Sequence, residues 1–336
     1  MTKVEQRSGP APSPAPGPSA DARPPRRTHG LRARIERFDA ALAETHPATF
    51  RRRSAALWML LPTAVVLVVF LYVPMARTFE LSLYRTAIFG QQRLFVGLEN
   101  FARVFTSPES LDAVVRTAII STLVIGGSIG IALLLAALMN QRIGGTRIYR
   151  LLLVWPLALS TAISGVVFRV MFDPNVGLIN SWLEPLGIQP EWFRDPTLAQ
   201  GILVMALIWN RVGFNLIFYT AAYQNLPRET LEAALVDGAT PWQRFWRVTF
   251  PLLSPITLFL LVTSTIFAFF DAFAIAAIFD GGPLNATSLL IYEIYENAFV
   301  FDARGLAAAQ SLLLFLAVGA LTVLQLRQGR KRVVYQ

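Results

Sequence analysis

The sequence is poor in the residues that most often carry catalysis and metal binding. It contains no cysteine, and its only two histidines are His29 and His46. The lack of cysteine excludes disulfides, thiolate metal sites and thiol nucleophiles. The lack of histidine after residue 46 excludes a histidine metal or acid–base centre in the long apolar part of the chain.

Lysine is almost as scarce, because Lys3 and Lys331 are the only two. A Walker A loop needs a lysine directly after its glycines to reach the phosphates of ATP, and neither lysine follows such a loop. A membrane-embedded enzyme would need paired acids, a metal cluster or a nucleophile with its base, and none is visible at a suitable depth. We therefore expect no catalytic residue, no metal site and no cofactor bound by this chain.

Apolar residues dominate what remains. They make up 54% of the sequence, charged residues make up 15%, and the mean hydropathy is +0.49. A helix needs roughly 20 apolar residues to cross a bilayer. Six such runs are present, at 55–73, 114–139, 151–171, 202–223, 252–278 and 306–324. The sequence predicts an all-α, polytopic membrane protein with six transmembrane helices in a cytoplasmic (inner) membrane.

The basic residues indicate the orientation of these spans, because they concentrate on the cytoplasmic side. With the N-terminus inside, the inner segments contain 21 of the 30 basic residues and the outer segments contain six. We therefore expect both termini, and the polar segment 226–250, to be cytoplasmic.

The first 54 residues form a separate part of the chain. Residues 1–30 contain seven prolines, which is typical of a disordered tail. Leu31, Ile35, Phe38 and Leu42 then fall on one face of a basic amphipathic helix, which either lies on the inner leaflet or packs on the bundle. The pI of about 10.4 implies an anionic partner. Because half of the basic residues lie in the two tails, we expect this partner to be membrane lipid and not nucleic acid.

The polar segment between the fourth and fifth apolar runs reads as a helix–turn–helix. Pro227 suits the first turn of a helix. Gly238 suits its end, because a residue there often has a positive φ angle. Thr240 and Gln243 then form a capping box around Pro241 at the start of the next helix.

The same segment contains a long motif made of Glu232, Ala233, Ala234, Asp237, Gly238, Ala239, Phe245 and Pro251. This motif resembles the EAA coupling loop of ATP-binding cassette (ABC) importer permeases, in which two short helices dock into a cleft of the ATPase subunit. A solvated helical hairpin or a DNA-reading helix–turn–helix has a similar spacing, but a DNA reader has no reason to lie between two membrane spans.

The resemblance extends over residues 55–336. The strings at 95–101 and 280–295 resemble the carbohydrate-uptake class of these permeases, and the end of the chain is most similar to the permease subunits of sn-glycerol-3-phosphate importers. Because sugar permeases share most of these strings, the resemblance implies a small polar solute that is sn-glycerol-3-phosphate, a glycerophosphodiester or a sugar. The resemblance implies a type I ABC importer. In such a system a second, homologous permease completes the pathway, two ATPase subunits bind ATP and Mg, and an extracytoplasmic solute-binding protein delivers the solute.

A few polar and aromatic residues inside the spans are candidates for the solute pathway. Ionisable groups in a bilayer are costly and usually face a cavity or a partner. Arg211 lies near the middle of a span, Asn215 is one turn further along the same face, and Asp271 is the one acid that we expect to be buried. We add Trp209 and Phe270 as candidates, because Trp209 lies close to Arg211 in the sequence and Phe270 precedes Asp271. The groups either form a path for a phosphorylated solute or hold the bundle together through an Arg–Asp pair.

One alternative function remains open, a secondary transporter or channel that ATP does not drive. Such a protein would usually need acid or histidine relays inside the membrane to couple ions. Here the only candidate relay is Asp271.

Overall fold

The computed structural model describes residues 53–86, 93–140 and 146–332. The chain divides into two parts, Met1–Leu67 and Val68–Gln336, which are described separately. In the first part the structure describes the helix α2 (Arg53–Leu67). The predicted disordered tail and the predicted basic amphipathic helix lie outside the described residues, and so do both histidines.

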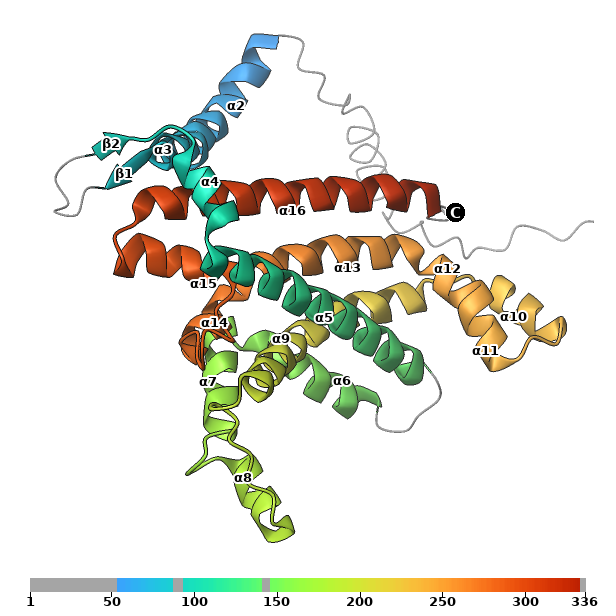
Figure 1. The fold of residues 1–336 in the computed structure, drawn as a ribbon. Coiled ribbons are helices and arrows are strands. Elements are labelled where there is room, and N and C mark those ends of the chain that lie inside the picture. The colour runs from blue at the N-terminus through green and yellow to red at the C-terminus, as the bar shows by residue number, and fades with distance from the viewer. Residues whose placement is uncertain (1–52, 87–92, 141–145, 333–336) are drawn as a thin grey trace, which may run out of the picture. The chain divides into compact units, whose positions relative to one another are not determined.

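The second part is helical apart from one short hairpin (Figure 1). Its first elements are η1 (Val68–Tyr72), α3 (Val73–Ser82), β1 (Tyr84–Thr86), β2 (Arg93–Phe95), α4 (Glu99–Thr106), α5 (Pro108–Met139), α6 (Thr146–Val154), η2 (Trp155–Ala158), α7 (Thr161–Met171), α8 (Leu178–Leu183) and η3 (Glu184–Leu186). The chain continues with α9 (Pro196–Gln224), α10 (Arg228–Val236), α11 (Pro241–Arg244), η4 (Phe245–Thr249), α12 (Phe250–Leu252), α13 (Ser254–Ile266), η5 (Phe267–Asp271), α14 (Phe273–Phe279), α15 (Leu290–Tyr295), η6 (Glu296–Val300) and α16 (Arg304–Arg332).

Five of the predicted spans are confirmed as long apolar helices. Among the described residues, the helices long and apolar enough to cross a membrane are Trp58–Ser82, Pro108–Met139, Pro196–Gln224, Ser254–Phe279 and Arg304–Gly329. Each runs beyond the predicted run at one end or both, because hydropathy does not include the polar turns that continue a helix.

The third predicted span, at 151–171, is present as two helical pieces, Leu151–Ala158 and Thr161–Met171, which are bent by 110° relative to each other. The break follows Pro156, where Leu159 is extended and the hydroxyl of Ser160 accepts a hydrogen bond from the Ile163 amide at 3.3 Å. Ser160 thus starts a new helix, and the pair forms either a broken span or a re-entrant segment.

The core of the second part centres on α9. This helix packs along α5, while α13 packs along α16 (Figure 1). Leu203, Leu207 and Leu216 on α9 are fully buried, as are the small residues Ala132 of α5 and Ala206 of α9. Small residues let helix backbones approach closely in a membrane bundle, where packing replaces the hydrophobic effect.

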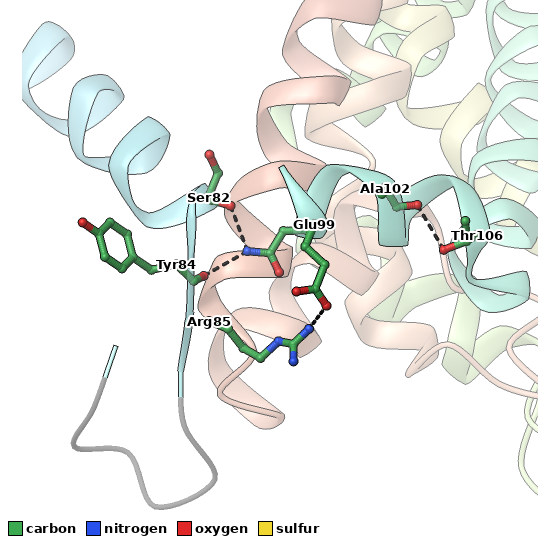
Figure 2. Close-up of polar contacts among 7 residues, drawn as sticks. Ser82, Tyr84, Arg85, Glu99, Ala102 and Thr106 are labelled. Atoms are coloured by element: carbon green, nitrogen blue, oxygen red, sulfur yellow. Dashed lines mark hydrogen bonds and ion pairs between the residues drawn. The ribbon is translucent and has the colours of Figure 1, made fainter. Parts of the chain in front are cut away.

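The strands β1 and β2 pair antiparallel, with Tyr84 opposite Phe95, and the hairpin is tied to the helices around it. The Asn100 amide of α4 donates to the carbonyls of Ser82 at 2.8 Å and Tyr84 at 2.9 Å, and Figure 2 shows Arg85 paired with Glu99. At Gly305 on α16 a Cβ atom would overlap the Tyr84 carbonyl oxygen, so only glycine allows α16 to approach β1 this closely.

Candidate functional site

Arg211 lies in the interior of the bundle. It is on α9 and keeps only 9% of its surface exposed, and Asn215, one turn later, is fully buried. A charged side chain in this position is costly unless other groups compensate it. The sequence prediction that Arg211 and Asn215 share one buried face is confirmed.

A chain of hydrogen bonds joins these residues to two further helices. Arg211 Nε donates to Ser264 Oγ on α13 at 3.3 Å, and Ser264 Oγ donates to Asn215 Oδ1 at 3.3 Å. Asn215 Nδ2 then donates to Ser128 Oγ on α5 at 3.2 Å. The sequence prediction did not include Ser128 and Ser264, because a serine in an apolar run shows nothing of its distant partner.

Two aromatic rings cover the guanidinium group. Its Cζ atom lies 4.0 Å from the ring centroid of Phe214 and 5.1 Å from that of Phe267. Cation–π contacts of this kind stabilise a desolvated arginine. They leave Arg211 Nη2 buried and without a hydrogen-bond partner among the described residues.

The expectation that Asp271 is a buried acid is wrong, because its side chain is exposed in this structure. Asp271 ends the π-helical turn η5 (Phe267–Asp271), which shifts the side chain relative to a regular α-helix. No salt bridge joins Arg211 to an acid within the described part of the chain, so an Arg–Asp pair does not explain why the arginine is buried.

The two aromatic candidates pack elsewhere. The Trp209 ring lies 5.5 Å from the ring of Phe168 on α7. Phe270 is partly buried and packs against a cluster that includes Ala113 and Leu314. The structure therefore brings together Arg211 and Asn215 and places Phe267, which the sequence prediction did not single out, against them.

The predicted helix–turn–helix at 226–250 is present and lies beyond the ends of α9 and α13 (Figure 1). Gly238 has φ +74°. Its amide donates to the Leu235 carbonyl at 3.1 Å, and the Ala239 amide donates to the Ala234 carbonyl at 3.0 Å. This pair of bonds is the Schellman motif, which confirms Gly238 as the residue that ends α10.

The start of the second helix is also confirmed. Gln243 N donates to Thr240 Oγ1 at 3.3 Å, and Thr240 N donates to Gln243 Oε1 at 3.0 Å, which completes the capping box. Pro227 differs by one position from its prediction, because it is the extended N-cap residue and the helix begins at Arg228. We name residues 226–251 the coupling hairpin.

The coupling hairpin exposes half of the eight motif residues. Glu232, Ala233, Asp237 and Gly238 are exposed, Ala234 is buried, and Ala239, Phe245 and Pro251 are half-buried. The hairpin also exposes large apolar groups, with Leu235 at 55%, Val236 at 88% and Trp242 at 71%. An exposed apolar patch rimmed by polar residues is typical of a protein-binding surface.

A row of aromatic rings supports this surface from the second helix. Trp246 contacts Trp242, Phe245 and Phe250, with ring centroids 5.6, 5.0 and 5.2 Å apart. The π-helical segment η4 (Phe245–Thr249) contains the centre of the row. The rings connect the hairpin to the start of α13 through α12.

The segment 280–303 between the last two spans is anchored by polar contacts. Glu293 Oε1 accepts from Ser110 Oγ at 2.8 Å and from Gln310 Nε2 at 2.7 Å, and Arg116 Nη1 donates to the Ser288 carbonyl at 2.7 Å. Thr117 Oγ1 accepts from the Leu290 amide at 2.7 Å. The segment is therefore fixed to α5 and α16.

Two side chains of this segment have perturbed acidity. Burial, with help from Glu296 and Asp280, raises the pKa of Tyr292 to about 12, and the Tyr292 hydroxyl donates to Asp280 Oδ1 at 3.1 Å. Burial and the charges of Asp280 and Glu293 raise the pKa of Glu296. No group of three or more acids or histidines that could hold a metal ion occurs among the residues described.

The chain has six apolar segments and an exposed hairpin between the fourth and the fifth of them. This is the architecture of a multi-span membrane permease. Residues 49–332 match the family described as the binding-protein-dependent transport system inner membrane component. The chain belongs to this family, and it is the membrane-spanning permease of an ABC importer located in the inner membrane.

Relatives with similar sequences support the same assignment. The chain is 38% identical over 288 residues to the sn-glycerol-3-phosphate transport system permease protein UgpA of Brucella suis, an alignment that covers 85% of this chain and 98% of that protein. It is also 38% identical over 279 residues to UgpA of Pectobacterium atrosepticum, covering 83% of this chain and 95% of the relative.

Solved structures share the fold. A bacterial ABC transporter involved in the import of the acidic polysaccharide alginate has a TM-score of 0.67 and 22% identity, covering 90% of this chain and 99% of that one. A bacterial alginate ABC transporter in complex with an alginate pentasaccharide-bound periplasmic protein gives a TM-score of 0.71 and 23% identity, covering 83% and 95%.

Proposed function

We propose that this permease forms half of the pathway for a small phosphorylated solute, sn-glycerol-3-phosphate or a glycerophosphodiester. The observation that carries the proposal is the buried guanidinium of Arg211, which no acid neutralises within the described residues. A cation inside the bundle favours an anionic solute over a neutral sugar. The relatives named as sn-glycerol-3-phosphate permeases, at 38% identity over nearly their whole length, support the same solute class.

The remaining parts of the transporter are separate chains. A second, homologous permease completes the pathway, and an extracytoplasmic solute-binding protein delivers the solute. Two ATPase subunits bind ATP and Mg, so this chain holds no cofactor and catalyses no reaction. Both of its termini and the coupling hairpin face the cytoplasm, where those subunits are.

The coupling hairpin receives the ATPase movement. Its exposed apolar residues Leu235, Val236 and Trp242 would be covered when the ATPase docks, and the exposed carboxylate of Glu232 would provide a polar anchor. The aromatic row around Trp246 then transmits the displacement of the hairpin to α13, which contains Ser264 beside Arg211. A rigid connection of this kind lets ATP binding reorient the bundle.

The experiment is solute uptake into proteoliposomes that contain the complete importer with its purified binding protein. The panel consists of sn-glycerol-3-phosphate, a glycerophosphodiester, glycerol and a neutral disaccharide. We expect ATP-dependent uptake of the phosphorylated solutes and none of glycerol or the disaccharide. Uptake of the disaccharide alone would overturn the solute class and leave the permease assignment intact.

A further inference from the structure

The unusual feature of Arg211 is that its hydrogen-bonding capacity is only partly used. Nε donates to Ser264 Oγ at 3.3 Å, while Nη2 is buried and has no hydrogen-bond partner in the part of the chain that the structure describes. Native proteins leave few buried polar groups unsatisfied, and each one needs an explanation. A guanidinium that served only to hold helices together would be expected to bond with all the groups that it buries.

The surroundings of the unused group suit an oxyanion. Asn215 and Ser264 place an amide and a hydroxyl next to the guanidinium, and Ser128 extends the chain onto α5. Arginine binds phosphate through a planar fork of N–H groups, and hydroxyl and amide donors satisfy the remaining oxygens. Among the described residues no carboxylate forms a salt bridge with Arg211, so no ion-paired acid occupies its N–H groups.

Phe267 covers this group, and the backbone under Phe267 is irregular. The ring centroid lies 5.1 Å from the Arg211 Cζ atom, and Phe267 begins the π-helical turn η5 (Phe267–Asp271). π-turns are rare and occur mostly as single turns at functional sites, where a shift of the turn moves the side chains on it. The same turn ends at Asp271, whose side chain is exposed.

We propose that Arg211, Asn215 and Ser264 bind the phosphate group of the transported solute, and that Phe267 covers this site until the π-turn shifts. The inference rests on the proposed function, because it takes the solute to be a phosphate ester. Since Nη2 is buried in this conformation, the solute reaches it only after a covering ring moves, and of the two rings Phe267 is the one that lies on the π-turn. The aromatic cover stabilises the cation while the site is empty and leaves it as the phosphate enters.

The first test separates charge from structure at Arg211 in the complete importer. Arg211→Met removes the charge and keeps the length of the side chain, and Arg211→Lys restores a point charge without the planar fork. The matched control is Arg169→Met, since Arg169 is an exposed arginine on α7 that bonds to the Ile278 carbonyl. Uptake of sn-glycerol-3-phosphate and co-purification of the subunits are measured for each variant.

We expect Arg211→Met to raise the KM for uptake by about tenfold to a hundredfold, because a hydrogen-bonded charge contributes roughly 1.5–3 kcal/mol. Arg211→Lys should recover part of that loss, and Arg169→Met should leave uptake unchanged. If Arg211→Met assembles and keeps the wild-type KM, the site is wrong. If Arg211→Met fails to assemble, uptake by Arg211→Lys and the binding test with Phe267→Ala decide whether the site exists.

The second test uses direct binding of radiolabelled sn-glycerol-3-phosphate to the complex without its binding protein. Phe267→Ala removes the cover, and Phe259→Ala is the control because Phe259 is an exposed phenylalanine on the same helix. We expect Phe267→Ala to bind the ester about tenfold more tightly than the wild type, because the closed state lowers the apparent affinity. Phe259→Ala should match the wild type, and unlabelled glycerol should not compete.

If Phe267→Ala does not increase ester binding, Phe267 does not cover the site. If the increase is seen and persists in the double variant Phe267→Ala/Arg211→Met, Arg211 does not bind the phosphate. Either result is distinct from failure of the proposed function. That failure would appear as an absence of phosphate-ester uptake by the wild-type importer, with another solute carried in its place.

Discussion

Replacing Gly238 with valine tests the coupling hairpin at its most constrained point. Gly238 has φ +74°, and a Cβ atom there would meet nothing within 4 Å in the isolated chain. Valine therefore clashes with no neighbour, and its cost comes from the backbone, about 1–2 kcal/mol for a side chain in the left-handed region and more for a β-branched residue. We expect the two Schellman hydrogen bonds to weaken and the angle between α10 and α11 to change.

The consequence is a weaker hold on the ATPase. A distortion of about 1.4 kcal/mol lowers the population of the docking-competent hairpin tenfold. Glu232→Ala adds an independent loss, because the docked ATPase would cover the exposed carboxylate of Glu232, and removing one member of a charged pair buried in an interface can cost roughly 2–5 kcal/mol. We expect both variants to insert normally, to lose the ATPase on purification, and to lose solute-stimulated ATP hydrolysis.

Gly187→Val is the matched control for backbone strain. Gly187 has φ +71° and open space around its Cα, so the same substitution has the same local cost at a site outside the hairpin. The ATPase should remain bound in this variant. If Gly187→Val loses the ATPase as well, general destabilisation explains the result. Full retention and stimulation in both Gly238→Val and Glu232→Ala would refute the coupling role.

Three further outcomes test other parts of the structure. Gly305→Ala should lower the thermal stability of the purified complex, because its Cβ would overlap the Tyr84 carbonyl and overpacking costs about 1–3 kcal/mol; Gly319→Ala on the same helix, in open space, should not. Thr240→Ala removes the capping box, worth about 1 kcal/mol, and should speed hydrogen exchange of the Gln243 amide about fivefold. Because the pKa of Glu296 is raised in the folded state, its ionisation destabilises the folded protein as the pH rises above the ordinary glutamate pKa of 4.5. Glu296→Gln should therefore raise the melting temperature near neutral pH and change it little below that value, and an equal gain at both would contradict this cause.

The coupling hairpin could be predicted from the sequence because its determinants are local. Gly238 and the pair Thr240 and Gln243 act on backbone groups within a few residues, so their order along the chain fixes the turn and the cap. The role of the hairpin in coupling stays a prediction. The exposure of its apolar residues, among them Leu235 at 55%, was not predicted, because the sequence of a short helix does not show which of its faces is left uncovered.

The interior site could be predicted only in part. Arg211 and Asn215 lie one turn apart, and helical spacing alone placed them on one face. Their partners Ser264 and Ser128 come from helices separated by long stretches of sequence, and one sequence contains no record of such contacts. The π-turn at Phe267–Asp271 is equally invisible to a helical period of 3.6, so the exposure of Asp271 could not be foreseen.

The break in the third span has a similar explanation. Hydropathy averages over a run and treats 151–171 as continuous. The local determinants Pro156 and Ser160 are present in the sequence, but proline is tolerated in membrane helices. Only the folded chain shows that the helix ends there and that Ser160 caps a new one.

The energy source of uptake decides whether this permease is part of an ATP-driven importer. Proteoliposomes containing the complete importer and its binding protein would be loaded with ATP or with a non-hydrolysable analogue, with and without a proton or sodium gradient. We expect uptake of sn-glycerol-3-phosphate only with ATP inside, unaffected by ionophores. Uptake driven by an ion gradient in the absence of ATP would refute the ATP-driven importer and favour a secondary transporter.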